Sequence, residues 1–224
     1  MAYDFEEQEQ IDSLKAWWKR FGNLLTWLLI IVLAVYSGWT GWNYYQRTQS
    51  TQASQLYEEL QKAVTLKDQA KVQRAAADMQ NKFGKTTYAQ MSALIAAKVA
   101  FDAHDLKMAK TQLQWVIDFG LDSEYKAIAK IRLAGILLDE KAYDAGLKVL
   151  SDANNYPAQF VGAADDRRGD ILFAKNKVAD ARLAYQAALK KMDQKNPGHQ
   201  LIQLKLDALG GEIVKVVEKS EQAK

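Results

Sequence analysis

The chain has 224 residues, a formal net charge of +3, no cysteine and only two prolines. The absence of cysteine excludes disulfides, zinc–thiolate sites and a thiol nucleophile, and the small positive charge gives no reason to expect nucleic-acid binding. Ala, Leu, Lys and Gln are abundant, which favours helix, and no stretch alternates like a β-strand. We therefore expect an all-α protein.

Residues 1–20 carry five acidic and three basic side chains. Ile11, Leu14, Trp18 and Phe21 recur at helical spacing within and just beyond this segment. This pattern indicates either a short helix lying on a membrane surface or simply the start of a membrane-spanning helix. Both interpretations are open at this point.

Residues 21–46 contain no charged side chain, and Arg20 and Arg47 flank them. A helix over 21–42 reaches roughly 33 Å, enough to cross a hydrocarbon core of about 30 Å. Tryptophans favour membrane interfaces, and four of them lie near the two ends of the stretch: Trp17, Trp18, Trp39 and Trp42. We interpret residues 21–46 as a single transmembrane anchor in contact with membrane lipid.

Other interpretations of this stretch agree less well with its residues. A cleaved signal peptide has an apolar run of roughly 7–15 residues behind a basic front, whereas this run is longer and its front carries acidic residues. A buried core helix rarely lacks charge over so long a stretch. Ser37 and Gly41 lie four residues apart and give only a weak signal for dimerisation of the span.

The basic residues beside the span predict its orientation. Lys15, Lys19 and Arg20 precede it, whereas Arg47 is the only Lys or Arg between the span and Lys62. The positive-inside rule counts Lys and Arg and largely ignores acidic residues. We therefore expect residues 1–20 in the cytoplasm and the rest beyond the membrane, which in a bacterium with two membranes is the periplasm.

Residues 47–209 contain an internal repeat in which two small residues lie twelve positions apart. The first pair, Ala63 and Ala75, is the weakest, and the first members of successive pairs are 34, 37 and 35 residues apart. Such spacing is typical of tetratricopeptide repeats, whose paired helices approach closely at small residues. The other three pairs predict the close-packing points: Ala97, Ala109, Ala134, Gly146, Gly169 and Ala181.

The repeat pattern predicts four helix pairs and a closing helix. The pairs are 51–66 with 70–82, 87–103 with 107–119, 123–139 with 142–153, and 157–174 with 178–191. The closing helix covers about 199–209, and residues 210–224 form a C-terminal tail. We thus divide the chain into an N-terminal segment (1–20), an anchor (21–46), a helical-repeat solenoid (47–209) and a tail (210–224).

The first helices of such repeats line a concave surface, and five residues there are candidates for partner binding: Tyr88, Lys126, Lys130, Asp165 and Arg168. Their mixed charges favour a partly apolar protein surface as the ligand. Asp165 and Arg168 also fit a solvated helix face with local ion pairs. His104 and His199 fit surface or turn positions, and no motif predicts a catalytic, cofactor or metal site, so we do not expect an enzyme.

Two stretches carry a family resemblance, IDSLKAWWKRFGN at the membrane and KIRLAGILLDEKAYDAGLKVL in the central repeat. Together with the order of acidic N-terminus, single span and diverged repeats over roughly residues 6–210, they resemble the YfgM family, described as the ancillary subunit of the SecYEG translocon. The resemblance implies an inner-membrane protein whose periplasmic repeats associate with the translocon, with the chaperone PpiD and with newly exported proteins. A tethered repeat adaptor of another envelope machine, for outer-membrane assembly or division, is the alternative.

Overall fold

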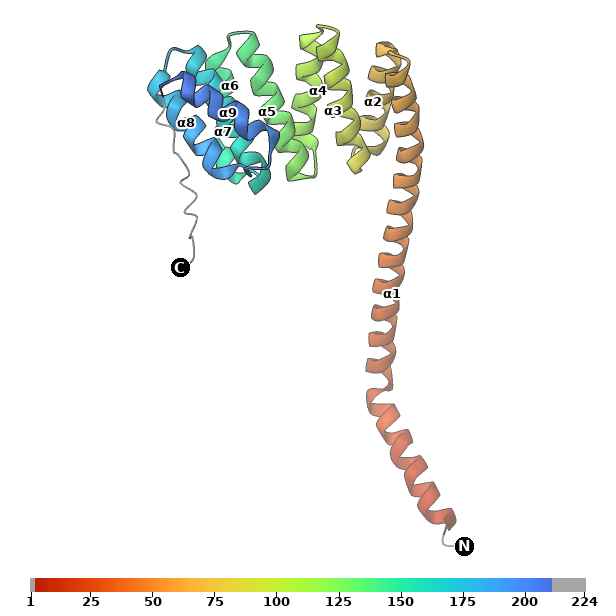
Figure 1. Ribbon diagram of the computed structural model, residues 1–224. Helices are drawn as coiled ribbons and strands as arrows, with labels where there is room; N and C mark the ends of the chain where they lie inside the picture. The colour runs from red at the N-terminus through yellow and green to blue at the C-terminus, as the bar shows by residue number, and fades with distance from the viewer. Residues whose placement is uncertain (1–2, 211–224) are drawn as a thin grey trace, which may run out of the picture. The chain divides into compact units, whose positions relative to one another are not determined.

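The computed structural model describes residues 3–210, apart from the side chains of residues 3–9 and 154 (Figure 1). In this part of the chain every element is a helix, which confirms the all-α prediction. The elements are α1 (Tyr3–Thr65), α2 (Gln69–Phe83), α3 (Thr87–Asp102), α4 (Leu106–Phe119), α5 (Ser123–Asp139), α6 (Tyr143–Val149), the 3-10 turn η1 (Ala153–Asn155), α7 (Ala158–Ala174), α8 (Val178–Lys191) and α9 (Pro197–Ala208). The tail beyond residue 210 lies outside the described residues.

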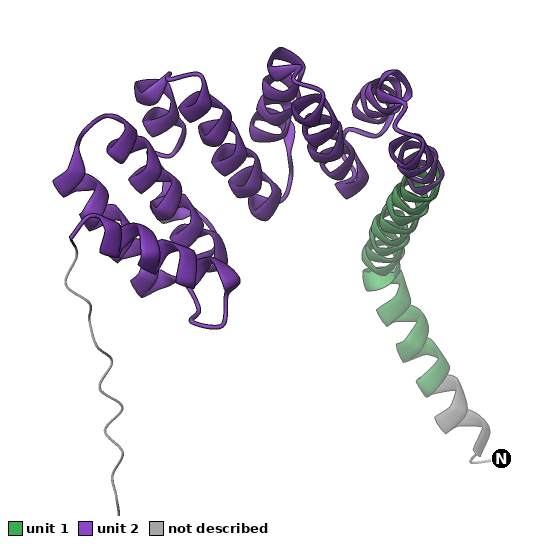
Figure 2. Cartoon of the chain, turned by 45° about the horizontal axis from the view of Figure 1, so that its top comes forward, with its two compact units in different colours: residues 1–52 green, residues 53–224 purple. Residues whose placement is uncertain are grey.

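The chain divides into two compact units, Met1–Gln52 and Ala53–Lys224 (Figure 2). The first unit consists of most of α1, and α1 contains a stretch long and apolar enough to cross a membrane. The large apolar side chains of this stretch are exposed, for example Leu24 at 63% and Ile31 at 59%, so the stretch is not the core helix of a globular domain. All four interface tryptophans are exposed as well: Trp17, Trp18, Trp39 and Trp42.

Sequence analysis begins the first repeat helix at residue 51, whereas α1 runs without interruption from Tyr3 to Thr65. Residues 47–50 contain neither proline nor glycine. The hydroxyls of Thr48 and Thr51 donate to the carbonyls of Tyr44 and Arg47, each four residues earlier and 3.0 Å away. These bonds are compatible with helical backbone, so the polar residues of this segment continue the helix.

The second unit contains four helix pairs followed by α9. The pairs are the end of α1 with α2, α3 with α4, α5 with α6, and α7 with α8. Buried clusters join consecutive helices: Leu60 of α1, Val72 of α2 and Ala96 of α3 share one cluster. In the last cluster, Ile202 and Leu206 of α9 pack against α8, so α9 covers the apolar end of the repeats.

The small residues predicted as close-packing points are buried, and their surroundings differ. Ala97 and Ala109 lie in one cluster formed by α3, α4 and α5, while Ala134 and Ala181 lie in the next two. A Cβ at Gly146 would lie 3.0 Å from Ile171 Cδ1, a tight contact, and 3.5 Å from the Ala134 carbonyl oxygen, an ordinary one. Gly169 faces the ring of Tyr185 across the α7–α8 pair.

The second helix of the third pair is shorter than predicted. Sequence analysis extends it over 142–153, but α6 ends at Val149 and a 3-10 turn follows at Ala153–Asn155. The backbone N–H groups of Ser151, Ala153 and Asn155 bond to carbonyls three residues earlier. Ser and Asp side chains compete with helical hydrogen bonding, which explains why regular helix stops in this Ser-Asp-Ala-Asn segment.

Each helix pair is joined by the same left-handed turn, which sequence analysis missed. The residue at the turn has positive φ in all four pairs: Lys67 (55°), His104 (60°), Lys141 (60°) and Asn176 (62°). The N–H group of this residue donates to the carbonyl three residues earlier, and the N–H group of the next residue donates to the carbonyl five residues earlier. At the second turn, His104 donates to the Phe101 carbonyl and Asp105 donates to the Ala100 carbonyl, each with an N–O distance of 2.9 Å. These two hydrogen bonds satisfy carbonyl groups at the end of the first helix.

A glycine at one of these turns should stabilise the repeats. Non-glycine residues in the left-handed region carry a steric penalty of about 1–2 kcal/mol, part of which glycine loses again through its larger unfolded-state entropy. We expect His104→Gly to raise the free energy of unfolding by about 0.5–1 kcal/mol. The exposed, mid-helix change Ala77→Gly should lower it by about 1 kcal/mol. Urea unfolding followed by circular dichroism measures both, and a loss of stability in His104→Gly would contradict the turn geometry.

Candidate functional site

The repeat unit carries a groove formed mainly by the first helices of its pairs. Its larger hollow, of about 680 Å³, has a mostly apolar lining from α1, α3 and α5 that includes Tyr57, Met91, Ile95 and Ile128. A second hollow of about 380 Å³ extends toward α7. Lys98, Asp102 and Arg132 line both hollows, so the two form one continuous surface.

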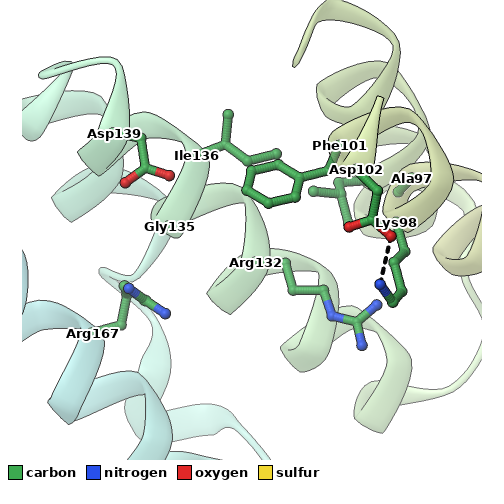
Figure 3. Close-up of a pocket in the computed structure, with 10 residues that line it drawn as sticks. Ala97, Lys98, Phe101, Asp102, Arg132, Gly135, Ile136, Asp139 and Arg167 are labelled. Carbon is green, nitrogen blue, oxygen red and sulfur yellow. Dashed lines mark hydrogen bonds and ion pairs between the residues drawn. The ribbon is translucent and has the colours of Figure 1, made fainter. Parts of the chain in front are cut away.

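The smaller hollow, here called the arginine pocket, combines an apolar wall with several charges (Figure 3). Its lining consists of Ala97, Lys98, Phe101, Asp102, Leu113, Arg132, Gly135, Ile136, Asp139 and Arg167. Phe101 is 41% exposed, although it is a large apolar side chain. Such an exposed apolar surface bordered by charges is typical of a protein-interaction site.

The charges of the arginine pocket are only partly neutralised within the chain. Lys98 donates to Asp102 at 2.6 Å, an i,i+4 pair on α3. Arg167 contacts Asp170 at 3.4 Å, but its buried Nε atom has no hydrogen-bond partner. Arg132 is exposed and forms no ion pair with the described residues. The exposed guanidinium group of Arg132 is therefore open to an outside anion, whereas the Nε atom of Arg167 is not accessible.

The five candidate residues for partner binding do not line this groove. Lys130 donates to Asp152 at 2.6 Å and lies over the ring of Tyr156, so its charge is engaged within the chain. Lys126 is half-buried and lines neither hollow. Tyr88 packs its ring 5.4 Å from that of Tyr57. The expectation that the first helices form the groove agrees with the pocket linings, whereas these residues lie outside them.

Asp165 and Arg168 form an internal ion-pair network instead. Asp165 is only 1% exposed, and it accepts from Arg168 at 2.7 Å and from Lys191 of α8 at 2.9 Å. Arg168 also donates to the Leu150 carbonyl at 2.9 Å. The placement of Asp165 on a binding surface is thus wrong, because its carboxylate ties α7 to α8.

A neighbouring network fixes the closing helix. Lys205 of α9 donates to Asp166 at 2.8 Å and to Asp170 at 2.7 Å, and the Tyr185 hydroxyl donates to Asp170 at 2.9 Å. Burial raises the pKa of Tyr185, and the adjacent Asp170 carboxylate raises it further. Burial alone would lower the pKa of Lys205, but its hydrogen bonds to the two carboxylates raise it overall. These groups join α7, α8 and α9.

The groove-facing residues could have been found from helical spacing. Tyr125, Ile128, Arg132, Ile136 and Asp139 of α5 recur at three- and four-residue steps, which places them on one face of the helix. Lys126 and Lys130 follow the same steps, but each lies one or two positions away from this set and so on another face. Lys126 and Lys130 thus stay predicted partner-binding residues that lie outside this groove.

Comparison with known proteins gives a consistent result over almost the whole chain. A family model described as a tetratricopeptide repeat-like domain matches residues 15–211. A protein of Neisseria gonorrhoeae called "Ancillary SecYEG translocon subunit" is 32% identical over 210 residues, which cover 93% of this chain and 100% of that protein. No solved structure matches the chain at comparable significance.

Proteins of the same name from other bacteria also match. The one from Aggregatibacter actinomycetemcomitans is 28% identical over 216 residues, covering 93% of this chain and 100% of that protein. The one from Escherichia coli is 28% identical over 204 residues, covering 91% of this chain and 96% of that protein. The family model and these relatives indicate a repeat scaffold and no catalytic family.

Proposed function

Because the chain belongs to the tetratricopeptide repeat-like family of the ancillary SecYEG translocon subunits, we propose that it is itself an ancillary subunit of the SecYEG translocon. The observation that carries this proposal is the full-length match: a relative of that name is covered to 100% by this chain. The similarity thus extends over both the apolar part of α1 and the repeats. In this proposal the chain supplies two components, an anchor and a binding scaffold.

The proposed arrangement is an inner-membrane protein with a cytoplasmic N-terminus and a periplasmic repeat unit. The apolar, exposed stretch of α1 supports the anchor. Lys15, Lys19 and Arg20 before the span, against Arg47 after it, support the orientation.

In this arrangement the repeats act as an adaptor at the exit of the channel. The groove offers apolar surface and charged groups for a protein ligand, with a PpiD-like chaperone and newly exported chains as its partners. Confinement to the membrane raises the effective concentration of these partners, so that weak contacts suffice. The protein thereby links export through SecYEG to folding assistance in the periplasm.

The orientation makes a direct prediction. A reporter that is active only in the periplasm should be active when fused after Lys224 and inactive when fused before Met1. Protease added to spheroplasts should digest the repeats of the unfused protein. Protection of the repeats from protease would contradict the proposed arrangement.

Photo-crosslinking tests the translocon association itself. A photoreactive residue is placed at Leu28, Ile31 or Val35, which lie along one face of α1. Irradiation of growing cells should give adducts with subunits of SecYEG from at least one of these positions. An unrelated single-span protein with the probe at the same depth serves as the control. Equal adduct yields from both proteins would refute a specific association.

A further inference from the structure

The closing helix α9 carries an apolar stripe on its exposed face. Ile202 and Leu206 pack against α8 on the inner face, whereas Leu201 and Leu204 are 55% and 66% exposed. Ala208 is exposed as well and continues the stripe, because the three exposed residues follow one another at three- and four-residue steps. The closing unit of a solenoid normally presents a polar outer face. The outer stripe of α9, Leu201, Leu204 and Ala208, is therefore a surface that a further element can cover.

The sequence directly after α9 has the pattern of such an element. Residues 212–219 read EIVKVVEK, and the apolar residues among them do not alternate with polar ones as in a strand. At about 100° per residue the four apolar side chains fall within an arc of about 160°, and the four charged side chains occupy the rest of the circle. The pattern predicts about two turns of amphipathic helix, in a segment that lies outside the described residues and beyond the family match.

This predicted helix needs an apolar partner. Isolated helices shorter than about 12–15 residues are marginal in water, and the valines at 214, 216 and 217 are weak helix formers. The helix therefore persists only if its apolar face is buried. The outer stripe of α9 suits it in length, since residues 201–208 and residues 212–219 each extend over about 10 Å as helix.

The connection between the two segments permits a reversal of direction. Gly210 has a φ of 69°, the left-handed conformation in which glycine ends helices, and its N–H donates to the Asp207 carbonyl at 3.0 Å. Gly211 follows it, and antiparallel helices are joined by loops of about 2–5 residues. With these two glycines as the loop, position 217 pairs with Leu204 and position 213 with Ala208, so that apolar residues meet in both pairs.

We propose that residues 212–219 fold back on α9 as an antiparallel helix and cover its outer stripe. This contact completes the end of the solenoid, because the outward face of the added helix carries the charged residues of the segment: Glu212, Lys215, Glu218 and Lys219. The occupant of the stripe is this segment rather than a second copy of the chain, because its covalent connection holds it beside α9 at a high effective concentration.

An engineered cysteine pair tests the contact, because the chain itself contains no cysteine. The full-length double variant Leu204→Cys/Val217→Cys is oxidised mildly in detergent, and the remaining free thiols are labelled with a maleimide–polyethylene glycol reagent. We expect an intramolecular disulfide, seen as a loss of labelling. The matched control is Leu204→Cys/Lys215→Cys, with the second thiol on the charged face. Its disulfide should form about tenfold more slowly, because bridged Cα atoms must lie within about 7 Å with facing Cβ atoms.

Three results would overturn the proposal. Equal rates for the two cysteine pairs would show that the segment presents no fixed face to α9. Disulfide-linked dimers on a non-reducing gel, in place of the intramolecular bond, would show that a second copy covers the outer stripe. Full labelling of both variants after oxidation would show that the segment does not lie on α9. The experiment contains no translocon, so its result is independent of whether the protein associates with SecYEG in cells.

Discussion

The Gly169→Ala substitution should lower the free energy of unfolding by about 3 kcal/mol, at the upper end of the usual range for overpacking. A Cβ at position 169 would lie 2.5 and 2.6 Å from two carbons of the Tyr185 ring, closer than real Cβ contacts come. The ring cannot move freely, because the Tyr185 hydroxyl donates to Asp170 at 2.9 Å and the side chain is only 3% exposed. The helices α7 and α8 must therefore separate.

Thermal unfolding of the detergent-solubilised chain measures this effect. A loss of about 3 kcal/mol corresponds to a decrease in Tm of about 6–12 °C for a protein of this size. The matched control is Gly135→Ala, the same substitution in another repeat helix, where a Cβ makes only ordinary contacts. It should leave Tm unchanged or raise it slightly. Similar decreases in Tm for both variants would show that the close approach of Gly169 to Tyr185 does not cause the destabilisation.

The Asp165→Ala substitution should also be strongly destabilising, by about 2–4 kcal/mol. It removes a buried acceptor of two charged hydrogen bonds, from Arg168 and Lys191, and leaves both cations without this partner. Arg168 then retains only its bond to the Leu150 carbonyl among these contacts. Because the network joins α7 to α8 and to the residues before η1, its loss should loosen the end of the solenoid.

Urea unfolding provides the measurement, with Asp139→Ala as the control. Asp139 is an exposed aspartate of α5 that forms no ion pair with the described residues, so its removal should change stability by less than about 0.5 kcal/mol. Asp165→Asn keeps the shape of the side chain and loses its charge, so its loss of stability should lie between those of Asp165→Ala and Asp139→Ala. If Asp165→Ala behaved like Asp139→Ala, the solvated helix face expected from the sequence would be the correct interpretation of Asp165.

The close-packing points of the repeats were predictable because their physical requirement restricts residue type. Two helices that touch need small side chains at the crossing, and the pairs Ala134 with Gly146 and Gly169 with Ala181 recur at a twelve-residue spacing in the sequence. The long apolar helix was predictable for a similar reason, since its stretch without charged residues is plain in the sequence.

Other features could not be read from the sequence, because their residue types carry no distinct signal. The left-handed turns hold Lys67, His104, Lys141 and Asn176 rather than glycine, so the usual marker of such a turn is absent. The continuity of α1 through residues 47–50 was not read either, because polar residues there, such as Thr48, bond to the helix itself. Asp165 looked like a surface charge, and only the packing of α8 against α7 buries it.

The proposed function is tested most directly by affinity purification of the full-length protein from gently solubilised membranes, followed by quantitative mass spectrometry. A chimera in which residues 21–46 are replaced by an unrelated span is purified in parallel. We predict that SecYEG subunits and a periplasmic chaperone are enriched with the native protein, and that SecYEG is lost with the chimera. Enrichment of outer-membrane assembly or division proteins in place of SecYEG would contradict the account.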